Sequence, residues 1–484
     1  MIVIVSDLHL TDGTSGATIA DDEFVRTLPP GAFRVFRQHL RDLAYNASWR
    51  RPDSPGDGPY YEPIDQFDLI LLGDVLDVMR SEKWLCEDEG GVRPWDAGSG
   101  PQKREALERK VGQIVRSILE RNEQSLGVLR GLSVGQDPKG WITLAPATEE
   151  GKPDDTVGWR PEATGRQRVR ARIHYMIGNH EWPLCLPGQG YDAIRAEIKR
   201  EMGLTNAANV PFPHDQSESE TLDEVLREHG VVARHGDIFD PFNYVAERGR
   251  NYSSLGDAIV IDLISRFPRE VKKLGGLIPP TVSEGLKEID NVRPHTILPV
   301  WITGLLRRAG ADDGQKKRVE DVWNRLVDAF FEIPFVRGLD SPWNWLDEVD
   351  QLQLVLKISK SISLSVTSAL VNWFSDKLPG LGSSSYRDAL EESDFKEKRA
   401  RFFVHGHTHH HEIVPLDVSI SEDGAELRQI YLNSGTWRRV HELAKYKTGE
   451  QEFVEYNVMS YLAFFKGNER RGRTFEAWSG ALAV

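Results

Sequence analysis

The feature of this sequence that most constrains its fold is a pattern that recurs six times, in which polar side chains directly follow a short apolar run. The first run, residues 2–5, contains only isoleucine and valine, and Asp7 and His9 come soon after it. The later runs are residues 68–72, 173–177, 231–234, 402–404 and 429–432. Runs of this kind are typical of strands buried on both faces. The pattern therefore predicts an α/β protein built around a central sheet.

The polar residues that follow these runs are mostly of types that bind metal ions. Besides Asp7 and His9 they are Asp74, Asp77, Asn179, His180, His235, His407 and His409. Glycines beside most of them allow the backbone to turn sharply where a strand stops. Because open α/β sheets bind ligands at the carboxyl ends of their strands, we expect these donors to converge on one edge.

The types of donor indicate the kind of site. Carboxylates, imidazoles and one carboxamide together suit Mn, Fe or Zn, with Mn preferred, rather than Ca or a structural zinc. The donors are too many for one ion, so we expect two divalent ions that share a carboxylate. Two ions about 3.5–4 Å apart can lower the pKa of a bridging water and hold a phosphate for in-line attack. The donor set therefore predicts a metal-dependent phosphoester hydrolase.

The order of the motifs resembles that of the calcineurin-like metallophosphoesterases. The motifs are Asp7-x-His9, Gly73-Asp74-x-x-Asp77, Gly178-Asn179-His180-Glu181, His235-Gly236-Asp237 and Gly406-His407-x-His409. The resemblance covers the core strands, roughly half of the chain. It implies a two-sheet α/β sandwich with flanking helices, to which this chain adds a large helical cap insertion.

The resemblance also implies a role for each motif residue. One metal ion would be held by Asp7, His9, Asp74 and His409. The second would be held by Asp74, Asn179, His235 and His407, with Asp74 as the bridge. His180 would act as general acid on the leaving oxygen, and Asp77 would orient and charge-stabilise His180. Two further acids, Glu181 and Asp237, would either steady these residues or serve the local turns.

Two insertions are expected to interrupt the core. The core would comprise residues 1–80, 166–240 and 401–484, the last ending in a strand over residues 453–465. The first insertion, residues 81–165, should contain helix over 102–130 and irregular structure beyond it. Helical spacing also predicts a helix over residues 33–49.

The second insertion, residues 241–400, is named here the cap insertion. Its apolar residues have helical spacing over 255–264, 319–331 and 346–373. It contains Trp301, Trp323, Trp343, Trp345 and Trp373. We interpret these tryptophans as filling the core of the insertion; the alternatives are an apolar substrate pocket or peripheral contact with a membrane surface.

Four arginines, Arg166, Arg168, Arg170 and Arg172, alternate with other residues at the period of a strand. The simpler interpretation is a solvated face of the strand that enters the core at this point. The alternative is contact with the phosphate of a substrate.

Composition limits the partners and the location of the protein. The net charge of −14 over 484 residues disfavours nonspecific binding of nucleic acid, while leaving room for a local basic groove. Two cysteines do not make a disulfide framework, and no apolar run is long enough to span a bilayer. Cleavage of a leader would remove Asp7. We therefore expect a cytoplasmic protein, with its oligomeric state left open.

The resemblance narrows the substrate only in part. The opening Ser6-Asp7-Leu8-His9-Leu10 and the His-Gly-Asp motif are similar to the UDP-2,3-diacylglucosamine hydrolases, which cleave a pyrophosphate bond. That branch usually carries arginine at the position of His180 and has a smaller cap. Phosphoprotein phosphatases typically have Arg-Gly where this chain has Val78-Met79. The expected substrate is thus a phosphomonoester, a phosphodiester or a pyrophosphate.

Two other functions are found among proteins that resemble this chain. A DNA nuclease similar to the metallophosphoesterase subunit of double-strand-break repair complexes shares the opening motif, but it would need a basic track for the duplex. A non-catalytic binding scaffold, like the metallophosphoesterase-fold subunit of retromer, could keep the sheets while losing the metal ligands. Because this chain retains every motif residue, we prefer the enzyme.

Overall fold

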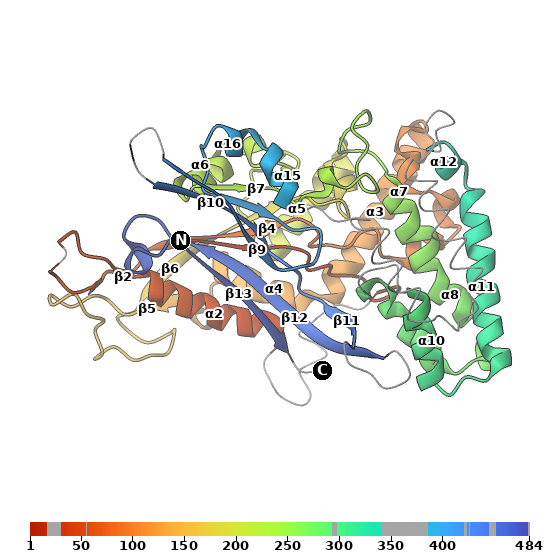
Figure 1. The fold of residues 1–484 in the computed structure, drawn as a ribbon, viewed down its shortest axis with the longest axis horizontal. Coiled ribbons are helices and arrows are strands. Elements are labelled where there is room, and N and C mark those ends of the chain that lie inside the picture. The colour runs from red at the N-terminus through yellow and green to blue at the C-terminus, as the bar shows by residue number, and fades with distance from the viewer. Residues whose placement is uncertain are drawn as a thin grey trace.

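The computed structural model describes residues 1–16, 31–54, 56–292, 298–339, 386–420, 424, 426–444 and 452–482. The fold is mixed α/β and contains two principal sheets and one small strand pair. Figure 1 shows the sheets gathered on one side of the molecule and the helices α7 to α12 of the cap insertion on the other. The expected α/β class is therefore confirmed.

The larger sheet has the strand order β11-β12-β1-β4-β6-β5, and β13 pairs with β12. Its strands are β1 (Ile2–Val5), β4 (Gln66–Leu72), β5 (Ile142–Leu144), β6 (Gln167–Met176), β11 (Arg439–Leu443), β12 (Phe453–Phe464) and β13 (Phe475–Leu482). β1, β4 and β6 are parallel neighbours. Their carboxyl ends therefore lie along the same edge of the sheet, which is the arrangement that ligand sites of α/β sheets require.

The smaller sheet has the strand order β7-β8-β10-β9. Its strands are β7 (Val231–Ala233), β8 (Phe402–His405), β9 (Glu412–Ile420) and β10 (Glu426–Asn433). β7, β8 and β10 run parallel, and β9 is antiparallel to β10. A separate pair joins β2 (Trp49–Arg50) to β3 (Tyr60–Tyr61). All six apolar runs of the sequence therefore form strands.

Strand β1 shows why its run is apolar without interruption. Ile2 and Ile4 belong to the hydrophobic cluster between the two sheets, whereas Val3 and Val5 belong to the cluster on the outer face of the larger sheet. Because successive side chains of a strand point to opposite faces, a strand covered on both sides must be apolar at every position.

Helices cover the outer faces of both sheets. On the larger sheet lie α2 (Ala32–Ala47), α3 (Pro101–Arg121), α4 (Glu123–Ser133) and α5 (Gln189–Met202). α6 (Glu220–Glu228) packs into the cluster between the sheets, and α15 (Tyr386–Glu391) and α16 (Ser393–Lys396) lie against the smaller sheet. The predicted helix over residues 33–49 is confirmed as α2, whose buried stripe includes Phe33, Phe36, Leu40 and Leu43.

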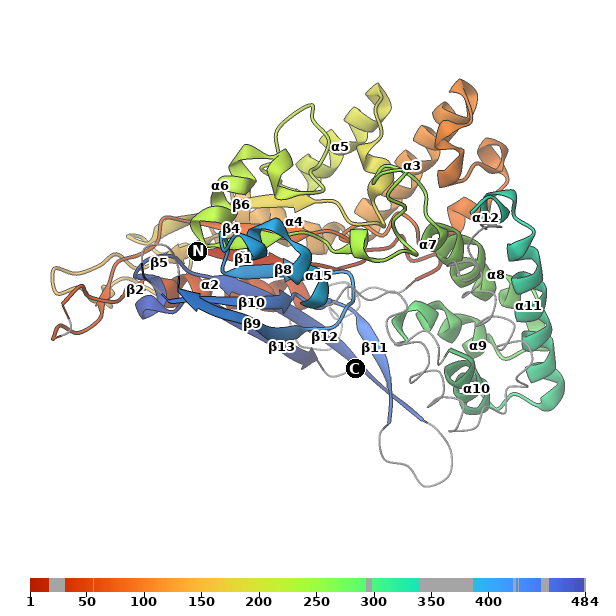
Figure 2. The same ribbon diagram turned by 45° about the horizontal axis from the view of Figure 1, so that its top comes forward.

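Most of the described part of the cap insertion, up to residue 339, is a group of helices with its own hydrophobic cluster, whereas α15 and α16 at its end pack on the smaller sheet, so the insertion as predicted extends too far into the core. The helices of the group are α7 (Leu255–Ala258), the π-helix η8 (Ile259–Ser265), α8 (Arg266–Lys272), α9 (Pro280–Gly285), α10 (Leu298–Arg308), α11 (Asp313–Phe331) and α12 (Pro334–Arg337). Figure 2 shows them together beyond the ends of the strands. Trp301 is buried in this cluster and Trp323 packs against it, as core-filling residues do. The predicted helix over 346–373 and Trp343, Trp345 and Trp373 lie outside the described residues.

Short 3₁₀ helices complete the described elements. They are η1 (Glu82–Leu85), η2 (Asp88–Gly91), η3 (Pro94–Gly98), η4 (Pro138–Gly140), η5 (Trp182–Cys185), η6 (Gln216–Glu218), η7 (Asp237–Phe239), η9 (Gly275–Leu277), η10 (Leu286–Asn291) and η12 (Glu469–Gly472). None of the helices in the described parts of the chain is both long and apolar enough to cross a bilayer.

The first insertion departs from expectation at one point. The helix expected over 102–130 is present as α3 and α4, but β5 forms within the stretch expected to be irregular and pairs antiparallel with the start of β6. Of the alternating arginines, Arg168, Arg170 and Arg172 lie on the first part of β6, and Arg166 directly precedes the strand. Arg168 lies 4.3 Å from the ring of Trp141, and Nε of Arg172 lies 2.7 Å from Oδ1 of Asp68. These two arginines contact neighbouring protein side chains, which supports the simpler interpretation of a strand surface.

Candidate metal centre

The structure brings all nine predicted site residues together where strands of both sheets end. They are Asp7, His9, Asp74, Asp77, Asn179, His180, His235, His407 and His409. They follow the carboxyl ends of β1, β4 and β6 in the larger sheet and of β7 and β8 in the smaller sheet. Seven of them are buried, and His407 and His409 are half-buried.

The backbone at this place is strained in an unusual number of residues. Asp7, His9, Asp74, His407 and His409 have φ angles of 53°, 45°, 50°, 68° and 61°. They are five of the nine non-glycine residues with positive φ in the described parts of the chain. Such conformations cost free energy for residues with a Cβ atom and occur preferentially at functional sites, where the surrounding structure holds them.

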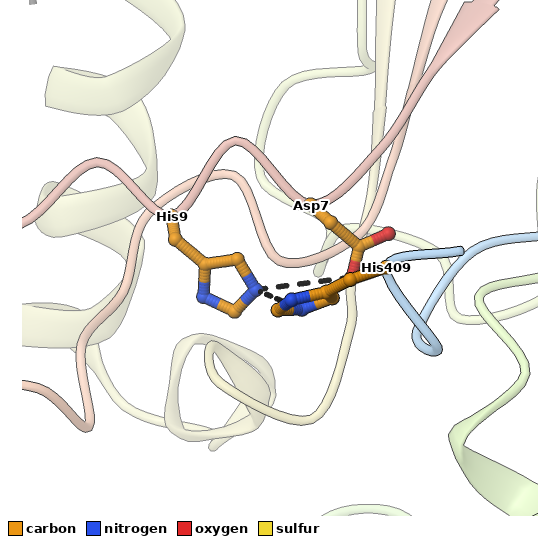
Figure 3. Close-up of side chains that lie close together, drawn as sticks. All are labelled: Asp7, His9 and His409. Atoms are coloured by element: carbon orange, nitrogen blue, oxygen red, sulfur yellow. Dashed lines mark hydrogen bonds and ion pairs between the residues drawn. The ribbon is translucent and has the colours of Figure 1, made fainter. Parts of the chain in front are cut away.

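The first group of donors consists of Asp7, His9 and His409 (Figure 3). The Nε2 atoms of His9 and His409 are 2.9 Å apart. Oδ1 of Asp7 lies 3.4 Å from Nε2 of His409 and 3.8 Å from Nε2 of His9. Burial raises the pKa of Asp7, but the imidazoles of His409 and His9 outweigh it and hold this pKa below its usual range. Asp7 is therefore a carboxylate, and its Oδ1 has no hydrogen-bond partner among the described residues.

The second group consists of Asp74, His235 and His407, with Asn179 beside it. Nε2 of His235 lies 3.2 Å from Oδ2 of Asp74 and 3.2 Å from Oδ1 of Asn179. Its other ring nitrogen, Nδ1, lies 2.9 Å from the carbonyl oxygen of Leu72 and donates to it. A backbone acceptor on Nδ1 leaves Nε2 to face the site, as in histidines that bind metals.

Asp74 links the two groups. Its Oδ2 lies 3.2 Å from Nε2 of His235 and 3.7 Å from Nε2 of His9, while its Oδ1 accepts a hydrogen bond of 2.9 Å from the backbone of His180. The close approach depends on Gly178, where an added Cβ would lie 2.3 Å from Oδ1 of Asp74. One carboxylate oxygen therefore faces both sets of imidazoles.

A third group contains His9, Asp77 and His180. Oδ1 of Asp77 lies 2.6 Å from Nδ1 of His180, and Oδ2 lies 2.9 Å from Nδ1 of His9. Burial lowers the pKa of His180, but the carboxylates of Asp77 and Asp74 outweigh it and raise that pKa to about 10. The carboxylates of the site therefore attract positive charge strongly.

No protein-family model matches this chain, and no curated protein matches its sequence. The chemistry of the site is therefore inferred from its residues alone. The described residues include three groups of histidine and aspartate that could hold a metal ion, and within each group the ligand atoms lie within 4.8 Å of one another.

The donor set fits divalent cations of the Mn, Fe or Zn class. It combines carboxylates with imidazoles, the mixture that such ions prefer. Two of its buried polar atoms, Oδ1 of Asp7 and Nδ1 of His407, have no hydrogen-bond partner among the described residues. Since buried polar atoms are normally satisfied, a cation is the partner that suits both.

Glu181 is one residue whose importance the sequence analysis left undecided. Its carboxylate accepts hydrogen bonds from the backbone N–H groups of Asp74, Val75, Leu76 and Gly178 and from the hydroxyl of Tyr175. It therefore holds the loop that carries Asp74. Of the two functions considered for Glu181, these contacts support the steadying of a site residue, because three of the donors belong to the loop of Asp74. The signal in the sequence was an acid directly after a predicted site residue.

Asp237 has a different role. Its Oδ1 lies 2.8 Å from Nη2 of Arg250, so it forms an ion pair with a residue of the cap insertion. Asp240, which the sequence analysis did not single out, lies three residues further on and has an oxygen 2.9 Å from Nε2 of His407. Asp237 also begins the turn η7 (Asp237–Phe239), in line with the turn role considered for it, and this turn is followed directly by Asp240.

Proposed function

We propose that this protein is a two-metal phosphoester hydrolase of the calcineurin-like metallophosphoesterase superfamily. The observation that carries the proposal is the position of Asp74, one oxygen of which lies within 4 Å of imidazoles in both groups of donors. A shared carboxylate is what two neighbouring cations need. The two packed sheets with helices on their outer faces support the same assignment.

The residues divide into two ligand sets in this proposal. Asp7, His9, Asp74 and His409 hold the first ion, and Asp74, Asn179, His235 and His407 hold the second. When bound, the pair of ions supplies an activated water nucleophile and neutralises charge on the phosphoryl group.

His180 supplies the acid chemistry. Oδ1 of Asp77 accepts a hydrogen bond from Nδ1–H of His180, so Nε2 is the atom that faces the centre, 4.0 Å from Oδ2 of Asp74. Nε2–H of His180 would donate a hydrogen bond to the phosphoryl group and then give its proton to the leaving oxygen as the bond from phosphorus to that oxygen breaks. The attacking water would form the new P–O bond and lose its proton to solvent. The substrate is a phosphomonoester, a phosphodiester or a pyrophosphate.

The test is hydrolysis of p-nitrophenyl phosphate and of bis-p-nitrophenyl phosphate by the full chain with added Mn²⁺. We expect hydrolysis by the wild type and none by Asp74→Asn, which removes the charge between the two groups. The relative rates on the two compounds distinguish a monoesterase from a diesterase. A parallel assay uses single- and double-stranded DNA, and cleavage of DNA without cleavage of the two nitrophenyl compounds would favour the nuclease. A protein that binds no Mn²⁺ and cleaves no phosphoester would favour the scaffold.

A further inference from the structure

A chain of three hydrogen bonds runs beside the second group of donors. Oδ2 of Asp240 lies 2.9 Å from Nε2 of His407 and 2.7 Å from Nδ2 of Asn243. Oδ1 of Asn243 in turn accepts a hydrogen bond of 3.2 Å from Nδ2 of Asn179. The chain therefore connects two of the ligands proposed for the second ion, and both of its other members come from one short segment, residues 240–243.

The carboxylate of Asp240 is the acceptor in each of three hydrogen bonds. Its Oδ1 accepts from the backbone of Phe242 at 2.9 Å, and its Oδ2 faces the amide of Asn243 and the ring of His407. A neutral imidazole carries its hydrogen on one nitrogen and a lone pair on the other. With Nε2–H directed to Asp240, the lone pair of His407 is on Nδ1, the buried ring nitrogen that has no hydrogen-bond partner among the described residues.

The same chain sets the orientation of the Asn179 amide. Asn243 donates through Nδ2 to Asp240, so its oxygen is the atom that remains for Asn179. Asn179 must then donate through Nδ2, and its Oδ1 lies on the side of His235, 3.2 Å from Nε2. The carboxylate of Asp240 thus fixes the orientation of the Asn243 amide, and Asn243 in turn fixes the orientation of the Asn179 amide.

We propose that Asp240, acting with Asn243, is a positioning residue for the second metal ion. It selects the tautomer of His407 that presents Nδ1 and, through Asn243, the amide orientation of Asn179 that presents Oδ1. The proposal rests on the proposed metal centre. Since the hydrogen bonds of Asp240 and Asn243 reach His407 and Asn179, which are both ligands proposed for the second ion, we expect the effect on that ion.

The segment is also anchored to the cap insertion. The backbone N–H of Gly256, in α7, donates to the carbonyl oxygen of Phe242 at 2.6 Å. An added Cβ at Gly256 would lie 2.1 Å from Oδ1 of Asn243, so only glycine permits this contact. The position of Asn243 therefore depends on the first helix of the cap insertion.

The test measures Mn²⁺ binding by the full chain after the metals have been removed with a chelator. We expect two Mn²⁺ per wild-type chain and, in EPR, the spectrum of an exchange-coupled pair. Asp240→Ala should bind the second ion about 10–100-fold more weakly, the usual effect of losing the partner of a metal-binding histidine. At limiting Mn²⁺ its spectrum should be that of an isolated ion.

Two further variants separate positioning from general damage to the fold. Asp240→Asn retains an oxygen that can accept from Nε2 of His407, so it should restore part of the lost affinity. Asn243→Ala should weaken the second ion less than Asp240→Ala, because only the orientation of Asn179 is released. Asp262→Asn is the matched control: this buried carboxylate pairs with Arg93 and Arg266, neither of which is a residue of the proposed centre, and the Mn²⁺ binding of the variant should equal that of the wild type.

Wild-type affinity for both ions in Asp240→Ala would overturn the inference. Equal weakening of both ions, accompanied by a lower melting temperature of the metal-free variant, would also overturn it, since that is the signature of a purely structural residue. A wild-type chain that binds no Mn²⁺ would instead refute the metal centre itself, and the inference with it. The two failures are distinguished by the wild-type measurement alone.

Discussion

Oδ1 of Asp77 lies 2.6 Å from Nδ1 of His180, and both side chains are buried beside Asp74. The pair holds the imidazole in one orientation with Nε2 toward the centre. In the proposed reaction this orientation would let His180 act as the general acid, a role that typically contributes about 10²–10⁴-fold to a rate.

The leaving group provides the test of that role. His180→Asn should lower kcat/KM for an alkyl phosphate ester by about 10²–10⁴-fold, because the alkoxide needs a proton to leave. The loss should be much smaller for p-nitrophenyl phosphate, whose nitrophenolate leaves without one. Steady-state kinetics on the two substrates measure the difference, and equal losses on both would rule out acid catalysis by His180.

Metal removal should destabilise the fold. Asp7, Asp74 and Asp77 are buried close together, so bound cations relieve their mutual repulsion. Free Mn²⁺ at 100 times the dissociation constant of a site should stabilise the chelator-treated protein by about 2.7 kcal/mol for each ion bound. Melting curves with and without Mn²⁺ measure the shift. Mn²⁺ should raise the melting temperature of Asp74→Asn only slightly. A rise equal to that of the wild type would place Mn²⁺ binding elsewhere.

Glu181 should be needed for the stability of the loop that carries Asp74. Glu181→Gln puts an amide group among N–H donors, so at least one donor loses its acceptor, and we expect a loss of about 1–3 kcal/mol. Urea unfolding of the metal-free protein measures the loss. Tyr175→Phe is the matched control: it removes one of the five donors and should cost about 1 kcal/mol. Equal effects of the two variants would contradict the proposed role.

Asp290 joins the cap insertion to the core. Its Oδ2 lies 3.0 Å from Nη1 of Arg80 and 2.7 Å from Nη1 of Arg438, and all three side chains are buried. Asp290→Ala would leave two buried guanidinium groups without this carboxylate, which should cost about 3–5 kcal/mol. Denaturant unfolding measures the loss, with Asp313→Ala on an exposed ion pair as the control. Similar values for the two variants would contradict this account.

The stability of the protein should fall in acid partly through Asp68. Burial raises the pKa of Asp68, but hydrogen bonds from His174 and Arg172 outweigh it and lower that pKa below its ordinary value of 3.8. A lowered pKa stabilises the fold above 3.8, and the contribution is lost as the pH falls through the folded value. Asp68→Asn should therefore be less stable than the wild type at pH 7, and the gap should close toward pH 3. Melting temperatures across this range measure the gap; a constant gap would exclude this origin.

The amino-acid sequence by itself determined the strands and the residues that follow them. An uninterrupted apolar run such as residues 2–5 is compatible with few structures except a strand buried on both faces. This pattern can be recognised within a few neighbouring residues. The apolar stripe of Phe33, Phe36 and Leu40 predicted α2 for the same reason. Parallel neighbours then brought Asp7 and Asp74 to one edge, as the pattern predicted.

Only the tertiary structure decided which residues support the site. Asp240 and His407 are separated by 167 positions, and neither residue type nor local spacing indicates that their side chains meet. The same holds for Glu181, whose hydrogen-bond donors in the Asp74 loop lie more than 100 positions away. The β5 strand formed because β6 offered an open edge, in a stretch whose own composition predicts loops. Local patterns specify which face of an element is buried, whereas partners distant in the chain are set by how the two sheets and the cap insertion pack.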